Sequence, residues 1–156
     1  MGGVARRPDP ERLAAWRLLL ETHAAVVDRL GAELEAECGL PLAWYDVLLQ
    51  LSGAPQGRLR MRDLADAVLL SRSGLTRLVD RMVAAGLVCR EAHPSDGRGA
   101  NAVLTPAGRA ALRRAAPVHL RGIEAHFARH LSGAEVGVLR TALDRVVSAE
   151  RRGRTE

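Results

Sequence analysis

The segment SRSGLTRLVDRMVAA, residues 71–85, carries the clearest structural signal in this chain of 156 residues. Ser71 supplies the side-chain oxygen of a helix N-cap, and apolar side chains recur behind it at helical spacing. Gly86 followed by Leu87 is typical of a helix C-terminus. The expected buried stripe is Leu75, Leu78, Val79, Met82 and Val83. The opposite face is polar and comprises Arg72, Ser73, Thr76, Arg77, Asp80 and Arg81.

The segments on either side of this helix complete a recognisable pattern. Residues 63–70 predict a short helix before it, and residues 87–92 and 101–104 predict two strands around a polar hairpin tip at residues 93–100. A short helix, a tight turn, a polar-faced helix and a two-stranded hairpin are typical of a winged helix-turn-helix lobe. The second helix of such a lobe enters the major groove of duplex DNA through its first turns.

The hairpin tip carries Arg98 between two glycines, with Asp96 two residues earlier. A guanidinium at such a tip can enter a narrow, strongly negative minor groove, and the carboxylate can orient it. The alternative is that Arg98 only solubilises a loop, and that the helix arginines form a solvated face. We expect Asp80 to pair with a neighbouring arginine. The candidate DNA-binding residues are Ser71, Arg72, Ser73, Thr76, Arg77, Arg81, Asp96 and Arg98.

Long helices are predicted at both ends of the chain. Asp9-Pro10 is a cap followed by a helical proline and begins a helix over residues 9–38. A helix of about 40 Å is longer than a small globule needs, so part of its apolar seam should pack against another chain. Its seam residues are Leu13, Trp16, Leu20, His23, Val27, Leu30 and Leu34.

Three further helices follow from caps and apolar spacing. A helix over residues 42–51 should turn Trp44, Val47, Leu48 and Leu51 inward. Thr105-Pro106 begins a helix that Pro117 should kink. Its apolar residues are Leu112, Ala116, Leu120, Ile123, Phe127 and Leu131. Ser132-Gly-Ala-Glu135 is a capping box that begins the last helix.

Composition and charge restrict the class of protein. With 47% hydrophobic and 26% charged residues, the chain is an ordinary globular domain, and its apolar runs are too short to cross a membrane. The net charge is −3 over residues 1–57 and +4 over each of residues 58–109 and 110–156. All 23 cationic residues are arginine, the side chain best suited to grip phosphates and base edges. Four aromatic residues are too few for a single-strand stacking platform.

Two stretches of the sequence resemble the multiple antibiotic resistance regulators, the MarR family. The first comprises Leu64-Ala65, residues 70–82 and Gly86-Leu-Val88, and the second comprises Asp96-Gly-Arg98 and Leu104-Thr105-Pro-Ala-Gly108. The resemblance implies a homodimeric transcription regulator, usually a repressor, whose first and last helices intertwine and whose effector pocket lies beside that interface. It also implies that Ser73, Thr76 and Arg77 read the major groove and that Arg98 is the wing arginine.

We therefore expect one mainly helical domain over residues 1–156. Its dimerisation lobe is built from residues 9–38 and 106–150, and its winged helix-turn-helix lobe from residues 41–105. The recognition helix covers residues 71–85 and the wing residues 87–104. The expected partners are duplex DNA, bound at an inverted repeat, and a second copy of the chain. The alternative is a helical dimeric module that binds a small molecule, zinc or another protein.

Candidate effector residues are aromatic and polar side chains of the first two helices. They suit a phenolic or other aromatic anion. His23 is the ambiguous member, because a seam histidine can equally be a satisfied core residue. The set is Trp16, Arg17, His23, Trp44 and Tyr45.

The sequence predicts neither a metal site nor an enzyme. His119, His126 and His130 have helical spacing, but no cysteine or carboxylate cluster in their helix completes a zinc site. The chain has no lysine, which excludes a P-loop, a Schiff base and a Ser-x-x-Lys motif. Cys38 and Cys89 cannot form a disulfide framework, which is consistent with a reducing, cytoplasmic location. We expect no cofactor.

Overall fold

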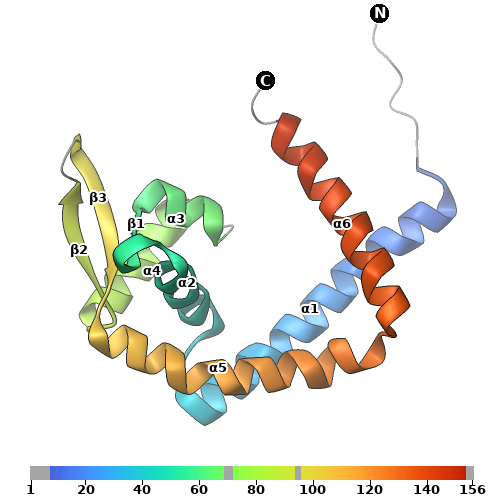
Figure 1. Cartoon of the computed structure of the whole chain (residues 1–156), viewed down its shortest axis with the longest axis horizontal. Coiled ribbons are helices and arrows are strands. Elements are labelled where there is room, and N and C mark those ends of the chain that lie inside the picture. The colour runs from blue at the N-terminus through green and yellow to red at the C-terminus, as the bar shows by residue number, and fades with distance from the viewer. Residues whose placement is uncertain (1–7, 69–71, 94–95, 154–156) are drawn as a thin grey trace, which may run out of the picture.

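The computed structural model of the protein describes residues 8–68, 72–93 and 96–153, with side chains for all of these except residues 72, 93 and 96–99. These residues form α-helices and one three-stranded sheet, which confirms the mainly helical winged helix-turn-helix fold (Figure 1). The elements in chain order are α1 (Pro10–Cys38), α2 (Leu42–Gly53), η1 (Pro55–Gly57), β1 (Arg58–Arg60), α3 (Met61–Ala67), α4 (Arg72–Ala84), β2 (Val88–His93), β3 (Asp96–Leu104), α5 (Pro106–His126), η2 (Ala128–His130) and α6 (Gly133–Gly153).

The first helix has the ends that the sequence predicts. The Asp9 carboxylate accepts a hydrogen bond from the Arg12 backbone N–H at 2.8 Å, and Pro10 occupies the first helical position. The helix ends at Gly39, whose φ of 60° lies in the left-handed region. The Gly39 N–H donates to the Glu35 carbonyl at 2.9 Å, as in a glycine C-cap. The 29 residues between these caps confirm the predicted long helix.

The predicted inward face of α2 is partly right. Val47, Leu48 and Leu51 are fully buried, but Trp44 is only half-buried and Tyr45 is buried in its place. α4 buries the predicted stripe apart from Val83, which is 37% exposed because it lies at the edge of the stripe, one residue before the helix ends.

The sheet differs from the predicted hairpin in two ways. Its order is β1-β3-β2, and β1 was not predicted because three residues are too few to show an alternating pattern. β1 pairs antiparallel with β3, with Arg58 opposite Val103. β3 begins at Asp96, so the prediction of a polar tip over residues 93–100 was wrong for residues 96–100. Backbone pairing continues there, with Ala92 opposite Ala100 and a register shift between Ala92 and His93.

Thr105 joins the recognition helix to the long helix that follows the wing. Its hydroxyl accepts a hydrogen bond from the Gly108 N–H at 3.0 Å and donates one to the Gly86 carbonyl at 2.7 Å. A Cβ at Gly108 would collide with the Leu87 carbonyl oxygen, so only glycine fits there. This contact fixes the start of α5 against the turn that ends α4.

One hydrophobic core lies in the lobe formed by residues 41–105, which we call the wing lobe. Side chains from α2, α3, α4, β2 and β3 fill it, and the first half of α5 and the end of α1 close it. Its members with no exposed surface include Leu34, Val47, Leu48, Leu51, Leu64, Val79 and Met82.

The opposite end of the molecule lacks such a core. α6 contains no buried residue, and the buried residues of α1 are confined to Leu30 and Leu34. We call residues 10–29 of α1 together with α6 the open arm. In the view of Figure 1, α6 crosses α1, and α5 connects it to the wing lobe. Large apolar side chains exposed on the open arm are Trp16, Leu18, Leu19, Leu20, Val27, Val136, Val138, Leu143, Val146 and Val147.

The helix α5 ends earlier than the sequence predicts. α5 continues through Pro117 but ends at His126, and Phe127 has the non-helical angles φ −137° and ψ −65°. Phe127 and Leu131 therefore lie outside α5, contrary to prediction. The capping box at the start of α6 is confirmed, because the Ser132 N–H donates to the Glu135 carboxylate at 2.8 Å and the Glu135 N–H donates to the Ser132 hydroxyl at 3.3 Å.

Candidate nucleic-acid interface

The recognition helix α4 separates into a buried face and an exposed face. Its buried residues hold it against the core of the wing lobe. The predicted reading residues Ser73, Thr76, Arg77 and Arg81 are all exposed. Arg72 is the first residue of α4, although its side chain lies outside the described residues, and so does the whole of Ser71. The helix thus presents the predicted polar side chains while its apolar side chains anchor it.

The wing lies next to this helix. β2 packs on α4, and β2 and β3 form the hairpin that carries Asp96 and Arg98 (Figure 1). The backbones of Asp96 and Arg98 belong to β3, and their side chains lie outside the described part of the chain. The expectation that Asp96 orients Arg98 stays a prediction.

Two ion pairs tie the wing to the rest of the lobe, and neither was predicted. Arg90 of β2 contacts the Asp80 carboxylate of α4 at 2.8 Å, and Arg58 of β1 contacts Glu91 of β2 at 3.2 Å. Asp80 was expected to pair with an arginine of its own helix, and its partner is instead Arg90 of the wing strand. Sequence spacing could not identify this partner, because the two residues meet only once the strand packs on the helix.

The five candidate effector residues do not gather around one cavity. Tyr45 lies in the core of the wing lobe, where its ring packs at a tilt against that of His119, with centroids 4.4 Å apart. Trp16 is 56% exposed on the open arm, and Trp44 is half-buried on α2. Arg17 lies in a shallow groove along the first turns of α1.

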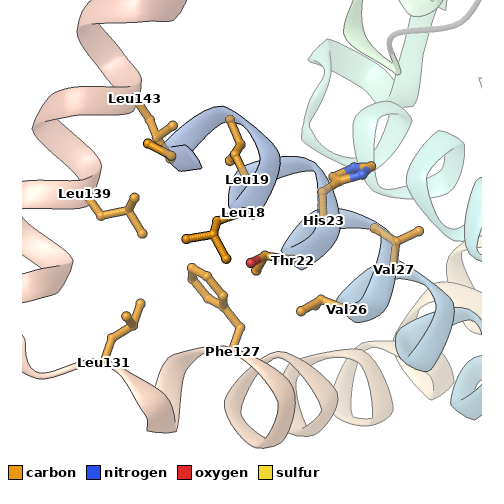
Figure 2. Close-up of a pocket in the computed structure, with 11 residues that line it drawn as sticks. Leu18, Leu19, Thr22, His23, Val26, Val27, Phe127, Leu131, Leu139 and Leu143 are labelled. Atoms are coloured by element: carbon orange, nitrogen blue, oxygen red, sulfur yellow. The ribbon is translucent and has the colours of Figure 1, made fainter. Parts of the chain in front are cut away.

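A cavity of about 470 Å³ lies in the open arm and includes His23 from the predicted set. Figure 2 shows Leu139 and Leu143 of α6 pointing toward α1, and Phe127 pointing toward Leu18 and Thr22. Its lining is almost wholly apolar and comprises Ala15, Leu18, Leu19, Thr22, His23, Val26, Val27, Phe127, Leu131, Leu139 and Leu143.

Burial shifts the pKa values of three titratable groups where α2 meets α5. Burial lowers the pKa of His119, and the nearby Asp46 carboxylate opposes this shift. Burial raises the pKa of Asp46, with His119 opposing. The pKa of Tyr45 is raised, chiefly by burial and also by Asp46. The buried Nδ1 of His119 has no hydrogen-bond partner, which favours an uncharged ring.

The three histidines proposed as weak metal candidates are separated. His119 packs against Tyr45, His126 Nε2 lies 2.6 Å from Glu33 of α1, and His130 is exposed in η2. Among the described residues, no three histidine, cysteine or acidic side chains are grouped so that they could hold a metal ion. Cys38 and Cys89 are both free thiols. Within the described chain, no helix combines the length and apolar character needed to cross a bilayer.

Comparison with known proteins follows this geometry. The sequence profile of the MarR family matches residues 39–99. The crystal structure of AbsC, a MarR family transcriptional regulator from Streptomyces coelicolor, superposes with a TM-score of 0.85 at 35% identity, covering 94% of this chain and 99% of that one. Among curated protein sequences, no match is found.

Two further solved structures contain DNA. Sco3205, a MarR family transcriptional regulator from Streptomyces coelicolor in complex with DNA, gives a TM-score of 0.85 at 33% identity and covers 92% of this chain and 91% of that one. A mutant of MarR from E. coli complexed with operator DNA gives 0.78 at 25% identity, covering 89% of this chain and 99% of that one.

Proposed function

Because the chain belongs to the MarR family of transcription regulators, we propose that it is a ligand-responsive repressor that binds an inverted repeat in duplex DNA as a homodimer. Membership of this family points to a DNA-binding regulator and not to an enzyme. The single observation that carries the proposal is the division of α4, whose apolar stripe is held in the core while Ser73, Thr76, Arg77 and Arg81 face solvent beside the wing.

Each part of the interface has its own role in this proposal. The first turns of α4 lie in the major groove, where Ser73, Thr76 and Arg77 contact base edges. Arg98 enters the adjacent minor groove, and Arg72 and Arg81 contact phosphates. The solved complex of Sco3205 with DNA, a protein 33% identical to this chain, supports DNA binding by this chain.

The homodimer is supported by the open arm. Ten large apolar side chains of the arm are exposed on the single chain, more than an isolated soluble protein commonly leaves in one region. A second copy packed on the arm would cover them and present two recognition helices. The half-sites of the inverted repeat should then lie about one helical turn, about 10 bp, apart.

The proposed response to a ligand depends on the spacing of the two recognition helices. A small aromatic or otherwise apolar molecule bound near α1 would favour a spacing that no longer matches successive major grooves, so the promoter is released. The cavity that His23 lines, about 470 Å³ and almost entirely apolar, is of a size that suits such a molecule.

A mobility-shift titration with DNA from upstream of the protein's own coding sequence tests this function. We expect tight binding that weakens steeply with salt, by about 0.9 log units per log unit of salt for each phosphate contacted. Arg98→Ala should weaken binding, and Arg152→Ala, which removes the same charge from the exposed end of α6, should not. Equal, weak binding to all duplexes would instead indicate an interaction module whose basic face is incidental.

A further inference from the structure

We propose that Arg90 is a positioning residue for DNA recognition, which clamps the wing to two successive turns of the recognition helix and masks the negative charge of Asp80. This inference rests on the proposed function, because it concerns how the two DNA-reading elements are held relative to one another.

The clamp has two contacts on α4. Arg90 Nη2 lies 2.8 Å from Asp80 Oδ1 and donates a hydrogen bond to the Thr76 carbonyl oxygen at 3.4 Å. Thr76 and Asp80 are four residues apart and therefore lie one above the other on the same helical face. One nitrogen of the guanidinium thus contacts both the backbone and a side chain of α4.

The clamp also sets the electrostatics of the helix face. Asp80 lies between Arg77 and Arg81 in the sequence, and its side chain is 60% exposed. An unpaired carboxylate there would repel the phosphates that the arginines attract. The Arg90 side chain, 33% exposed, neutralises this carboxylate from the side of the wing. Arg90 therefore removes the one negative charge from a face of α4 on which Arg72, Arg77 and Arg81 already outnumber Asp80.

Arg90 is linked to the wing arginine, Arg98, through the antiparallel pairing of β2 with β3. Arg90 lies opposite Ala102, and the same pairing continues through Ala92 opposite Ala100 toward Arg98 on β3. Fixing Arg90 on α4 therefore fixes the base of the hairpin whose outer end carries Arg98. Arg90 thereby helps to hold the major-groove and minor-groove readers at one separation.

A double-mutant cycle with a DNA-free measurement tests the clamp. The variants are Arg90→Ala, Asp80→Asn and the double variant. Arg58→Ala serves as the matched control, because it removes the same charge and breaks the Arg58–Glu91 pair, which does not involve α4. Circular dichroism melting checks the fold of each variant. Titration against the preferred duplex gives affinity, and amide hydrogen exchange of residues 73–84 without DNA gives the order of the helix.

The expected result is that Arg90→Ala binds about tenfold more weakly, because a carboxylate near phosphates is left unmasked. Replacing Asp80 by asparagine in the same chain should restore most of the affinity, and Arg58→Ala should change it less than Arg90→Ala does. Exchange in α4 should rise in Arg90→Ala and stay unchanged in Arg58→Ala.

Two results would overturn the inference. If the Arg90→Ala variant and the double variant are weakened equally while exchange in α4 stays unchanged, Arg90 contacts the phosphate itself. If Arg90→Ala changes neither affinity nor exchange, the clamp has no function. A wild-type protein that binds no duplex contradicts the proposed function instead, and in that case unchanged exchange in Arg90→Ala still refutes the clamp.

Discussion

Large apolar side chains are buried in the wing lobe but exposed in the open arm. In the wing lobe, residues such as Leu48, Leu64 and Met82 have no exposed surface. In the open arm, Leu18 is 61% and Val138 71% exposed, although both belong to helices of more than 20 residues with caps at their starts. The wing lobe is therefore completed by this chain alone, whereas the arm has helices without a core of their own.

This difference indicates that the helices of the open arm have defined ends although one chain provides no core for them to pack against. Caps and continuous hydrogen bonding define where α1 and α6 begin, but most helical stability in proteins comes from packing of the apolar face. The arm lacks that packing within one chain. We infer that a second copy supplies it, and that the DNA-reading surface of the wing lobe is positioned by an assembly formed elsewhere in the fold.

The largest effect is expected from a core substitution in the wing lobe. Leu64→Ala removes a fully buried side chain and should lower the free energy of unfolding by about 2–5 kcal/mol. Val83→Ala, at a position 37% exposed in the same lobe, should cost less than half as much. Urea denaturation followed by circular dichroism measures both. If both substitutions lower the free energy of unfolding by the same amount, burial in the wing lobe does not determine how much a side chain stabilises the fold.

A charge placed on the open arm should separate assembly from folding. Leu143→Asp introduces a carboxylate among the apolar residues that line the arm cavity, so the dimer should dissociate. Light scattering should give the mass of one chain, and DNA affinity should fall by about 10²–10⁴ because two linked half-site contacts become one.

Ala107→Asp is the control for that experiment. It introduces the same charge at an exposed residue in the first turn of α5, outside the open arm. It should leave the mass and the affinity close to those of the wild type. An unchanged mass in Leu143→Asp would mean that the arm is not the interface.

The capping box offers a smaller and more local effect. Ser132→Ala removes the hydroxyl that the Glu135 N–H and carboxylate both contact, and should cost about 1 kcal/mol. The hydrogen bonds from Ser132 also lower the pKa of Glu135. The part of the cap that depends on the ionised carboxylate is therefore present above the ordinary pKa of glutamate, 4.5, and is lost as the pH falls through the lowered value. Faster amide exchange should be confined to the start of α6, and Ser148→Ala in the same helix should not produce it.

A pH dependence of stability is expected where α2 meets α5. Burial lowers the pKa of His119 below its ordinary value of 6.5, so the folded state favours the neutral ring. Stability should be complete above pH 6.5 and should fall as the pH drops through and below that value, since the unfolded chain binds the proton more readily. His119→Phe keeps an aromatic ring packed against Tyr45 but cannot titrate. The melting temperature of this variant should therefore change less between pH 7 and pH 5 than that of the wild type. If the melting temperature of His119→Phe falls as steeply with pH as that of the wild type, the pH dependence of stability comes from other groups.

Much of this fold was predictable from local signals. Asp9-Pro10, Gly39, Thr105-Pro106 and the Ser132–Glu135 box mark the helix ends because each acts on the backbone within a few residues. The buried stripe of α4 followed from helical spacing alone. On the polar face of α4, Ser73, Thr76, Arg77 and Arg81 are exposed where the polar pattern predicted.

What the sequence did not reveal depends on contacts between distant segments. β1 exists because three residues pair with β3, more than forty positions away, and the pairing needs no particular side chains. Arg90 meets Asp80 only through the packing of a strand on a helix. Tyr45 was expected in an effector pocket, but it packs against His119, a residue 74 positions later in the chain.

Hydroxyl-radical footprinting of the DNA upstream of the protein's own coding sequence tests the central claim most directly. Two recognition helices held by one dimer should protect two patches on one face of the duplex, with centres about 10 bp apart, and Leu143→Asp should abolish this paired protection at the same protein concentration. A single patch, or protection without sequence preference, would contradict the account.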